Sequence, residues 1–237
     1  MFKPIKKKSL SNEVYEQIRD QILSGQMKAG DTLPSERILC EQFGVNRGAI
    51  REAIKRLEQA QLIRVQHGGG TKILDYRNSG GIELLPALLM LEGNLNPEVI
   101  RGVMELRAAL GKDIARLCTM RASEELLGDL AQTIEDMSDS TGDLPRLEFL
   151  TVRFWDLLVE GSDNIAYRLA YNALRNVFAK LRSAFQGAFS AEWQDLSRFQ
   201  RIYDAMLEKD IPKVQEGIED LLTSSSPQLI NMLVEDS

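Results

Sequence analysis

Residues 30–57 have the sequence GDTLPSERILCEQFGVNRGAIREAIKRL, which predicts two helices joined by a tight turn. The segment 34–36 (PSE) is a typical helix start, and Gly44 is expected to end this first, short helix. Asn46 is expected to cap the next helix, because asparagine side chains accept hydrogen bonds from free backbone N–H groups. A short helix, a glycine-containing turn and a basic helix are the pattern of a helix-turn-helix. The basic side chains that we place on the outer face of the last helix are Arg47, Arg51, Lys55 and Arg56.

Upstream of this stretch the sequence predicts an amphipathic helix over residues 11–23. Val14, Ile18 and Ile22 recur every fourth residue, and Gly25 follows as a stop signal. We expect this helix to be the first of three in an N-terminal domain.

Downstream of the basic helix the sequence predicts a β-hairpin. The flanks, LIRVQ (62–66) and TKIL (71–74), have the composition of strands, and HGGG (67–70) lies between them. Glycines tolerate positive φ and let the backbone lie close to another molecule. Directly after a basic third helix, this hairpin is expected to be the wing of a winged helix-turn-helix.

The charge is unevenly distributed along the chain. Residues 1–78 contain 14 Lys and Arg against 9 Asp and Glu, a balance of +5, whereas residues 79–237 contain 15 against 26, a balance of −11. A basic head on an acidic body predicts that the head is the part that meets a polyanion.

Residues 79–237 show helical periodicity and no convincing alternation of the kind found in strands. The fold class is therefore mainly α, with a winged helix-turn-helix domain over 1–78, a linker near 76–81 and an all-helical domain over 79–237 for ligand sensing, dimerisation or both. The helical patterns lie near residues 82–92, 97–119, 123–138, 144–159, 164–189, 191–208 and 211–222.

Three blocks resemble the signature of the GntR superfamily of transcriptional regulators: GDTLPSER (30–37), FGVNR (43–47) and REA (51–53). The resemblance implies a homodimer whose two heads bind a palindromic operator, with the third helix in the major groove and the wing near the minor groove. The family usually has Ser or Thr where this chain has Asn46 and Gly48. The DNA-binding residues that the resemblance implies are Arg37, Asn46, Arg47, Gly48, Arg51, His67, Gly68 and Gly69.

The helical domain resembles the effector domain of the FadR subfamily, through Arg107, GSDN (161–164) and IYDAM (202–206). Many such domains hold a divalent metal through one Asp and three His. The corresponding positions here are Thr151, Trp155, Phe199 and Leu221, and the one histidine of the chain, His67, lies in the wing. No metal site is therefore predicted, because imidazole ligands are missing; a site built from the carboxylates of Glu148 or Asp156 stays open.

The apolar replacements resemble the metal-free branch of the subfamily that responds to fatty acids, which implies long-chain acyl-coenzyme A as the effector of a repressor. The alternatives are an organic or sugar acid, and a DNA-binding dimer that needs no ligand. The aromatic residues could equally be core, and the arginines could pair with the many carboxylates of this domain. The candidate effector-binding residues are Arg107, Trp155, Arg175, Phe178 and Tyr203.

Several other classes are disfavoured. No catalytic constellation or phosphate-binding glycine loop is present, so we expect no enzyme and no cofactor. The longest apolar stretch, residues 84–91, is too short to cross a bilayer, and residues 1–9 lack the apolar segment of a secretory signal. A cytoplasmic protein with two reduced cysteines, Cys40 and Cys118, and no membrane partner is expected.

Overall fold

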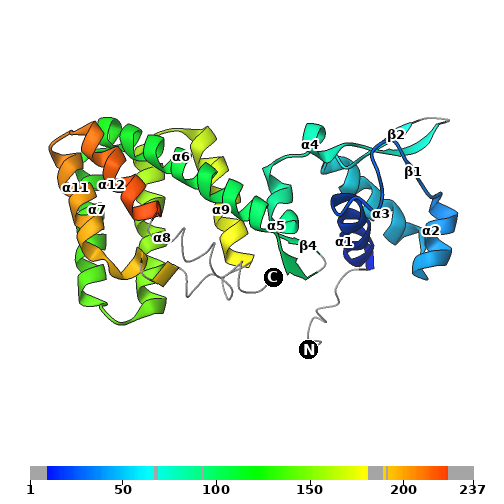
Figure 1. Ribbon diagram of the computed structural model, residues 1–237, viewed down its shortest axis with the longest axis horizontal. Coiled ribbons are helices and arrows are strands. Elements are labelled where there is room, and N and C mark those ends of the chain that lie inside the picture. The colour runs from blue at the N-terminus through cyan, green and yellow to red at the C-terminus, as the bar shows by residue number, and fades with distance from the viewer. Residues whose placement is uncertain (1–9, 67–68, 92, 181–188, 191, 224–237) are drawn as a thin grey trace, which may run out of the picture. The chain divides into compact units, whose positions relative to one another are not determined.

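The computed structural model describes residues 10–66, 69–91, 93–180, 189–190 and 192–223 (Figure 1). Contacts divide the chain into two compact units, residues 1–96 and residues 97–237, which we call the head and the body. Among the described helices, none is long and apolar enough to cross a membrane.

The head has the winged helix-turn-helix fold that the sequence predicts. Three antiparallel strands lie in the order β1-β3-β2, and β2 and β3 form the hairpin of the wing, with Arg64 opposite Lys72. In chain order the elements are α1 (Leu10–Leu23), β1 (Thr32–Leu33), α2 (Glu36–Phe43), α3 (Arg47–Gln59), β2 (Ile63–Gln66) and β3 (Gly70–Ile73).

Local capping sets the ends of α2 and α3. The hydroxyl of Ser35 accepts a hydrogen bond from the Ile38 N–H at the start of α2. Gly44 ends this helix with a φ of 64°, a left-handed conformation that glycine adopts at little cost. The side chain of Asn46 then accepts from the Ala49 N–H at 2.9 Å and starts α3. The turn between the two helices is thus determined by residues within the turn itself.

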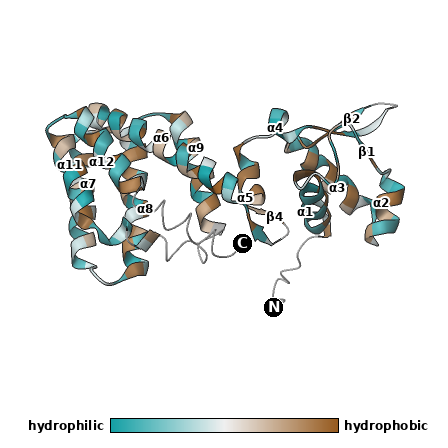
Figure 2. Ribbon diagram, in the orientation of Figure 1, coloured by the Kyte–Doolittle hydropathy of each residue, from teal (hydrophilic) through white to brown (hydrophobic). Residues whose placement is uncertain are grey.

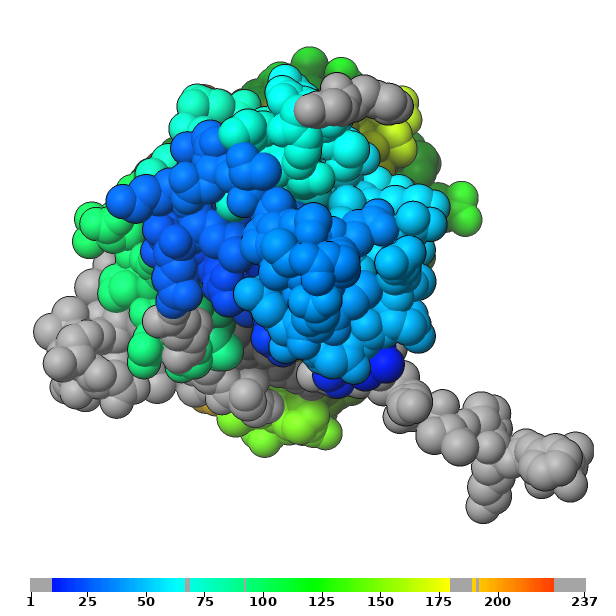
Figure 3. Space-filling model, turned by 90° about the vertical axis from the view of Figure 1, so that its right-hand side faces the viewer, coloured from blue at the N-terminus to red at the C-terminus, as the bar shows by residue number. Residues whose placement is uncertain are grey.

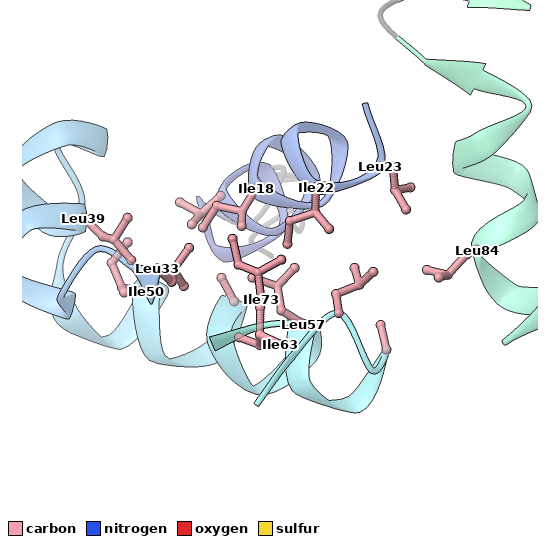
Figure 4. Packing of buried hydrophobic residues seen from close by; sticks show 14 residues of the cluster. Ile18, Ile22, Leu23, Leu33, Leu39, Ile50, Leu57, Ile63, Ile73 and Leu84 are labelled. Carbon is pink, nitrogen blue, oxygen red and sulfur yellow. The ribbon is translucent and has the colours of Figure 1, made fainter. Parts of the chain in front are cut away.

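The core of the head lies between α1, α3 and the sheet (Figure 4). Ile18 and Ile22 of α1 lie across from Leu57 of α3 in the middle of the cluster, whereas Ile50 of α3 lies beside Leu39 of α2. The fourfold spacing on each helix therefore produces the predicted buried face. Because this core fixes α3 from behind, the opposite face of α3 is left on the surface.

The segment that follows the wing differs from its prediction. It contains α4 (Tyr76–Ser79), a 3₁₀ turn (Ile82–Leu84), α5 (Leu85–Leu88) and a small hairpin of β4 (Met90–Leu91) and β5 (Asn94–Leu95). The helix predicted over 82–92 is wrong beyond Leu88, because the chain turns back into the hairpin.

This segment also belongs to the head rather than to the body. Leu84 is 2% exposed and packs in the head core, with Ala87, Leu88 and Leu91 against the same cluster. The two units accordingly divide after Asn96, whereas the sequence analysis puts the domain boundary after residue 78. The boundary is predicted where the composition of the sequence changes. The apolar side chains that follow this point nevertheless pack against the core of the head, which precedes them in the chain.

The body is a bundle of helices, each with one hydrophobic side (Figure 2). The long helix α6 packs against α8, α9 and α12, while α7 packs against α8 and α11. The helices predicted over 97–119, 123–138, 144–159 and 211–222 agree with the structure within a few residues. The helix predicted over 164–189 is confirmed as far as Lys180, and residues 181–188 lie outside the described residues. Of the helix predicted over 191–208, residues 192–194 are helical and α11 starts at Leu196. The described helices of the body are α6 (Pro97–Arg121), α7 (Glu124–Asp139), α8 (Leu144–Gly161), α9 (Ile165–Lys180), α11 (Leu196–Leu207) and α12 (Ile211–Thr223).

Candidate nucleic-acid interface and ligand cavity

The outer face of α3 carries positive charge on the surface of the head. Arg47, Arg51 and Lys55 are all exposed, and they follow one another at the four-residue spacing that places side chains on one face of a helix. Figure 3 shows the head from the side on which α2 and α3, in blue shades, reach the surface. This is the face that a helix-turn-helix inserts into the major groove.

Two arginines of this surface are held by carboxylates of the head. Arg51 Nε donates to both carboxylate oxygens of Glu36, at 2.9 and 3.2 Å, and Arg37 pairs with Glu41 at 2.6 Å. All four side chains are largely exposed, and exposed pairs of this kind contribute at most about 1 kcal/mol. A phosphate or a guanine edge can therefore replace the carboxylate.

Arg47 differs from these two arginines. It is the first residue of α3 and forms no ion pair with any residue in the described part of the chain. Its guanidinium is available to a phosphate or a base edge without giving up a carboxylate partner. Beside it, Gly48 is exposed and leaves the start of α3 without a side chain.

Asn46 and Arg56 have structural roles in the head. The Asn46 side-chain oxygen caps α3, and the contact of this residue with DNA stays a prediction. The sequence analysis places Arg56 on the outer face, and this is wrong: its guanidinium donates to Asn12 at 2.9 Å and lies 4.2 Å from the centre of the Tyr15 ring. Arg56 turns towards α1 because both partners lie there.

Of the three residues predicted at the tip of the wing, the structure describes Gly69. Gly69 is exposed, and its N–H donates to the Gln66 carbonyl at 3.1 Å, which closes the turn. His67 and Gly68 lie outside the described residues. On the strand that follows, Lys72 donates to Thr32 at 2.7 Å and ties β3 to β1.

The body contains a cavity of about 340 Å³ between α6, α8 and α9. This volume lies at the lower end of the range for small-molecule sites, roughly 300–1,000 Å³. Its walls are mainly aliphatic and aromatic. The lining residues are Arg107, Leu110, Gly111, Ile114, Glu148, Thr151, Val152, Trp155, Tyr171, Leu174, Arg175, Phe178, Ala179, Phe189 and Trp193.

Arg107 enters this cavity as one half of a buried ion pair. Its two terminal nitrogens donate to the carboxylate of Glu192 at 2.6 and 3.1 Å, and the Glu192 side chain is fully buried. The guanidinium also lies over the rings of Phe178 and Phe189, at 5.7 and 5.2 Å. Removing one partner of such a pair leaves an uncompensated buried charge, at a cost of about 3–5 kcal/mol.

The second arginine of the cavity is also paired. Arg175 donates to one oxygen of the Asp156 carboxylate at 3.0 Å, and Arg168 donates to the other at 2.9 Å. Both oxygens of Asp156 are thus engaged, so this carboxylate does not fit the metal site that the sequence leaves open. Burial, and after it the Asp156 carboxylate, raises the pKa of the Tyr171 phenol well above its ordinary value, so this group stays protonated.

The structure brings together four of the five candidate effector-binding residues. Arg107, Trp155, Arg175 and Phe178 line the cavity, whereas Tyr203 lies half-buried on α11 and is not among the lining residues. The periodicity of α11 places Tyr203 on an apolar face, but that face packs against α7 and α12 instead.

The positions that the FadR resemblance assigns to metal ligands do not fit a metal. Thr151 and Trp155 line the cavity, while Phe199 and Leu221 are fully buried in the core, where Phe199 meets Phe154 edge to face at 5.1 Å. No group of three His, Cys, Asp or Glu side chains comes together in the described part of the chain.

Trp193 and Gly111 line the cavity but are absent from the predicted effector-binding residues, and so is Glu192, which pairs with the lining residue Arg107; Thr151 is predicted only as a lost metal-ligand position. Glu192 lies 85 residues from Arg107, and nothing local identifies it as the partner. Gly111 could have been identified from the sequence. A glycine inside a helix destabilises it by about 0.5–1 kcal/mol relative to alanine, so its presence indicates a position where a side chain would not fit. A Cβ there would lie 3.1 Å from Trp155 Cη2 and 2.9 Å from Leu222 Cδ1, so Gly111 makes room for the indole.

A winged helix-turn-helix with a basic third helix, on a chain that also carries a helical domain with a cavity, defines a class of protein: a DNA-binding transcriptional regulator. Comparison with family models gives the family. The model for bacterial regulatory proteins of the gntR family matches residues 10–73, and the FCD domain model matches residues 102–224. The chain belongs to the GntR family of transcriptional regulators and carries an FCD effector-binding domain.

Two curated relatives illustrate the similarity. The HTH-type transcriptional regulator Mce2R of Mycobacterium tuberculosis is 34% identical over 99% of this chain and 97% of its own. The fatty acid metabolism regulator protein of Klebsiella pneumoniae is 27% identical over 75% of this chain and 72% of its own.

A solved structure supports the fold. The structure described as "Lar controls the expression of the Listeria monocytogenes agr system and mediates virulence" aligns with a TM-score of 0.58 and 17% identity, covering 98% of this chain and 99% of that one. At this identity the likeness concerns the fold alone.

Proposed function

We propose that the protein is a homodimeric repressor that releases its operator when a fatty-acyl ligand, long-chain acyl-coenzyme A, occupies the body. Operator binding relies on Arg47 and Arg51 of α3, on Arg37 of α2 and on the wing. These roles are supported by the guanidinium of Arg47, which has no carboxylate partner among the described residues, and by the exchangeable pairs of Arg51 and Arg37.

The observation that carries the ligand proposal is the apolar cavity of the body. Leu110, Ile114, Val152, Leu174 and Phe178 offer it hydrocarbon surface. Burial of each methylene contributes about 0.8 kcal/mol, so such walls favour a long acyl chain over a small polar acid. The similarity to a relative named fatty acid metabolism regulator protein also favours a ligand from fatty acid metabolism.

The charges around the cavity favour an acyl group over a small anion. Both arginines of the lining have carboxylate partners, Glu192 for Arg107 and Asp156 for Arg175. A free organic or sugar acid would have to displace one of these carboxylates from its arginine. An acyl chain fills the apolar part of the cavity without breaking either pair.

Release of DNA requires that the ligand bind the DNA-incompetent conformation of the dimer more tightly than the competent one. In the competent conformation the two heads match half-sites about 34 Å apart, one turn of the double helix. Any change in this spacing costs contacts in one half-site.

The test is a fluorescence-anisotropy titration of the protein on DNA from its own promoter region, repeated with palmitoyl-coenzyme A, palmitate or coenzyme A. We expect micromolar palmitoyl-coenzyme A to release the specific complex and coenzyme A alone to leave it intact. Release by palmitate at similar concentration would identify the free acid as the effector.

Specific DNA binding that none of these compounds changes would contradict the fatty-acyl proposal while leaving the DNA-binding role intact. A screen of organic and sugar acids would then follow. A complex that no compound of any class releases would indicate a DNA-binding dimer that needs no ligand.

A further inference from the structure

Two buried polar atoms on α8 lack a hydrogen-bond partner among the described residues, and both belong to residues that line the cavity. They are Thr151 Oγ1 and Trp155 Nε1, in side chains that are 4% and 7% exposed. Residues four apart lie on the same face of a helix, so α8 presents both groups to the same side. A buried donor or acceptor without a partner destabilises the fold, and such groups are rare in native proteins.

Thr151 departs from the other buried threonines of the bundle. Thr119 donates to the carbonyl of Ala115 at 2.8 Å, and Thr133 donates to that of Asp129 at 2.7 Å, each within its own helix. This is the ordinary way for a helical threonine to satisfy its hydroxyl. A third atom of the same kind, Arg198 Nε, lies 2.8 Å from the Asp195 carboxylate and so has an ionic partner. The two unpartnered groups therefore coincide with the cavity.

The chemistry of the pair indicates what it binds. An indole N–H can only donate a hydrogen bond, and a threonine hydroxyl can donate or accept. Together they match an acceptor oxygen on the ligand. Both groups are neutral, which suits a carbonyl oxygen better than a phosphate, and the charged groups of the lining that could bind an anion are already paired, Arg107 with Glu192 and Arg175 with Asp156.

We infer that Trp155 Nε1 and Thr151 Oγ1 bind the acyl carbonyl oxygen of the ligand and thereby select a fatty-acyl group over a plain hydrocarbon chain. This inference rests on the proposed function, since it concerns the same cavity. Gly111 contributes by leaving room for the Trp155 ring on the facing helix α6. The hydrocarbon chain lies along the apolar walls, and the carbonyl determines how far it enters.

The test measures binding of two ligands to the full chain by calorimetry. Palmitoyl-coenzyme A has the carbonyl oxygen, whereas S-hexadecyl-coenzyme A, a thioether, has the same chain length and lacks it. The variants are Thr151→Val, which keeps the shape of the side chain, and Trp155→Phe, which removes the N–H. We expect each variant to bind palmitoyl-coenzyme A about two- to tenfold more weakly, as for the loss of a neutral hydrogen bond, and to bind the thioether as the wild type does.

Thr119→Val is the matched control, because it removes a buried hydroxyl outside the cavity lining and should leave both affinities unchanged. If Trp155→Phe does not fold, Thr151→Val still gives the comparison between the two ligands. Fluorescence adds a second readout, since both tryptophans of the chain, Trp155 and Trp193, line the cavity. In a Trp193→Phe background, palmitoyl-coenzyme A should shift the emission of Trp155 to longer wavelength, and the thioether should not.

The outcomes separate the two proposals. If the substitutions lower the affinity for both ligands equally, or for neither, the carbonyl site is wrong. Binding of palmitoyl-coenzyme A by the wild type would still support the proposed function in that case. A wild-type protein that binds neither ligand would overturn both.

Discussion

At the scale of single residues, the arginines on the surface of α3 differ in whether they form an ion pair. Arg47 forms no ion pair with a described residue, whereas Arg51 would have to leave Glu36 to bind DNA. The exchange is inexpensive because the pair is exposed, and a phosphate can accept two parallel hydrogen bonds from a guanidinium. Glu36 thereby holds the guanidinium near the start of α3 until DNA arrives.

Replacement of either arginine tests this view. We expect Arg47→Ala and Arg51→Ala each to weaken operator binding, because each removes a charge-assisted contact. If the lost contact is to a phosphate, the slope of log K against log salt should fall by about 1. Anisotropy titrations at several salt concentrations measure both quantities.

Arg153→Ala is a suitable control for these variants, since Arg153 is an exposed arginine of the body that pairs with Asp129 at 3.6 Å. If both α3 variants bind the operator with the affinity of the wild type, α3 is not the recognition helix.

At the scale of elements, the crossings between helices of the body depend on positions without a side chain. Gly161 at the end of α8 is buried, and a Cβ there would lie 2.5 Å from Cys118 Sγ on α6 and 3.0 Å from Leu126 Cδ2 on α7. Gly128 in α7 has the opposite surroundings, with nothing within 4 Å of a Cβ. The same residue type thus serves packing at one position and has no packing role at the other.

This contrast predicts opposite effects of one substitution on the free energy of unfolding. Gly161→Ala should destabilise the body by about 1–3 kcal/mol, because an added methyl group overpacks the crossing. Gly128→Ala should stabilise it by about 0.5–1 kcal/mol, because alanine favours the helix and meets no neighbour. Urea denaturation followed by circular dichroism measures both, and a Gly161→Ala variant as stable as the wild type would show that the helices can separate at this crossing without cost.

At the scale of the whole molecule, the proposed function implies that ligand and DNA compete through the conformation of the proposed dimer. If the ligand weakens DNA binding by a certain factor, DNA weakens ligand binding by the same factor. If the effector binds in the cavity of the body, as proposed, the contacts in that cavity determine how much free energy the effector can contribute to the release of DNA. An apolar cavity makes that contribution depend on the length of the acyl chain.

We accordingly expect the affinity for acyl-coenzyme A to rise with chain length. Each added methylene should tighten binding about fourfold, equivalent to about 0.8 kcal/mol, until the cavity is filled. Calorimetry with the C8 to C16 thioesters measures the series, with coenzyme A as the zero-length reference. An affinity independent of chain length would mean that the chain lies outside the cavity.

The sequence alone was sufficient for what short-range interactions determine. The caps at Ser35, Gly44 and Asn46 act on backbone groups within four residues, and the apolar spacing of α1 and α3 defines their buried faces. The helix-turn-helix, its exposed arginines and most helix bounds of the body followed from such patterns.

The tertiary structure alone decided which distant side chains meet. Periodicity says that a face is buried but does not name the neighbour, so the pairing of Arg107 with Glu192 and the packing of Leu84 into the head core were not predictable from spacing. For the same reason the sequence identifies Trp155 only as an apolar replacement. That its N–H and the Thr151 hydroxyl lack a hydrogen-bond partner among the described residues is visible only in the packed helices around the cavity. Hydrogen-bond satisfaction is a property of the assembled fold, because it depends on every element that packs around a group.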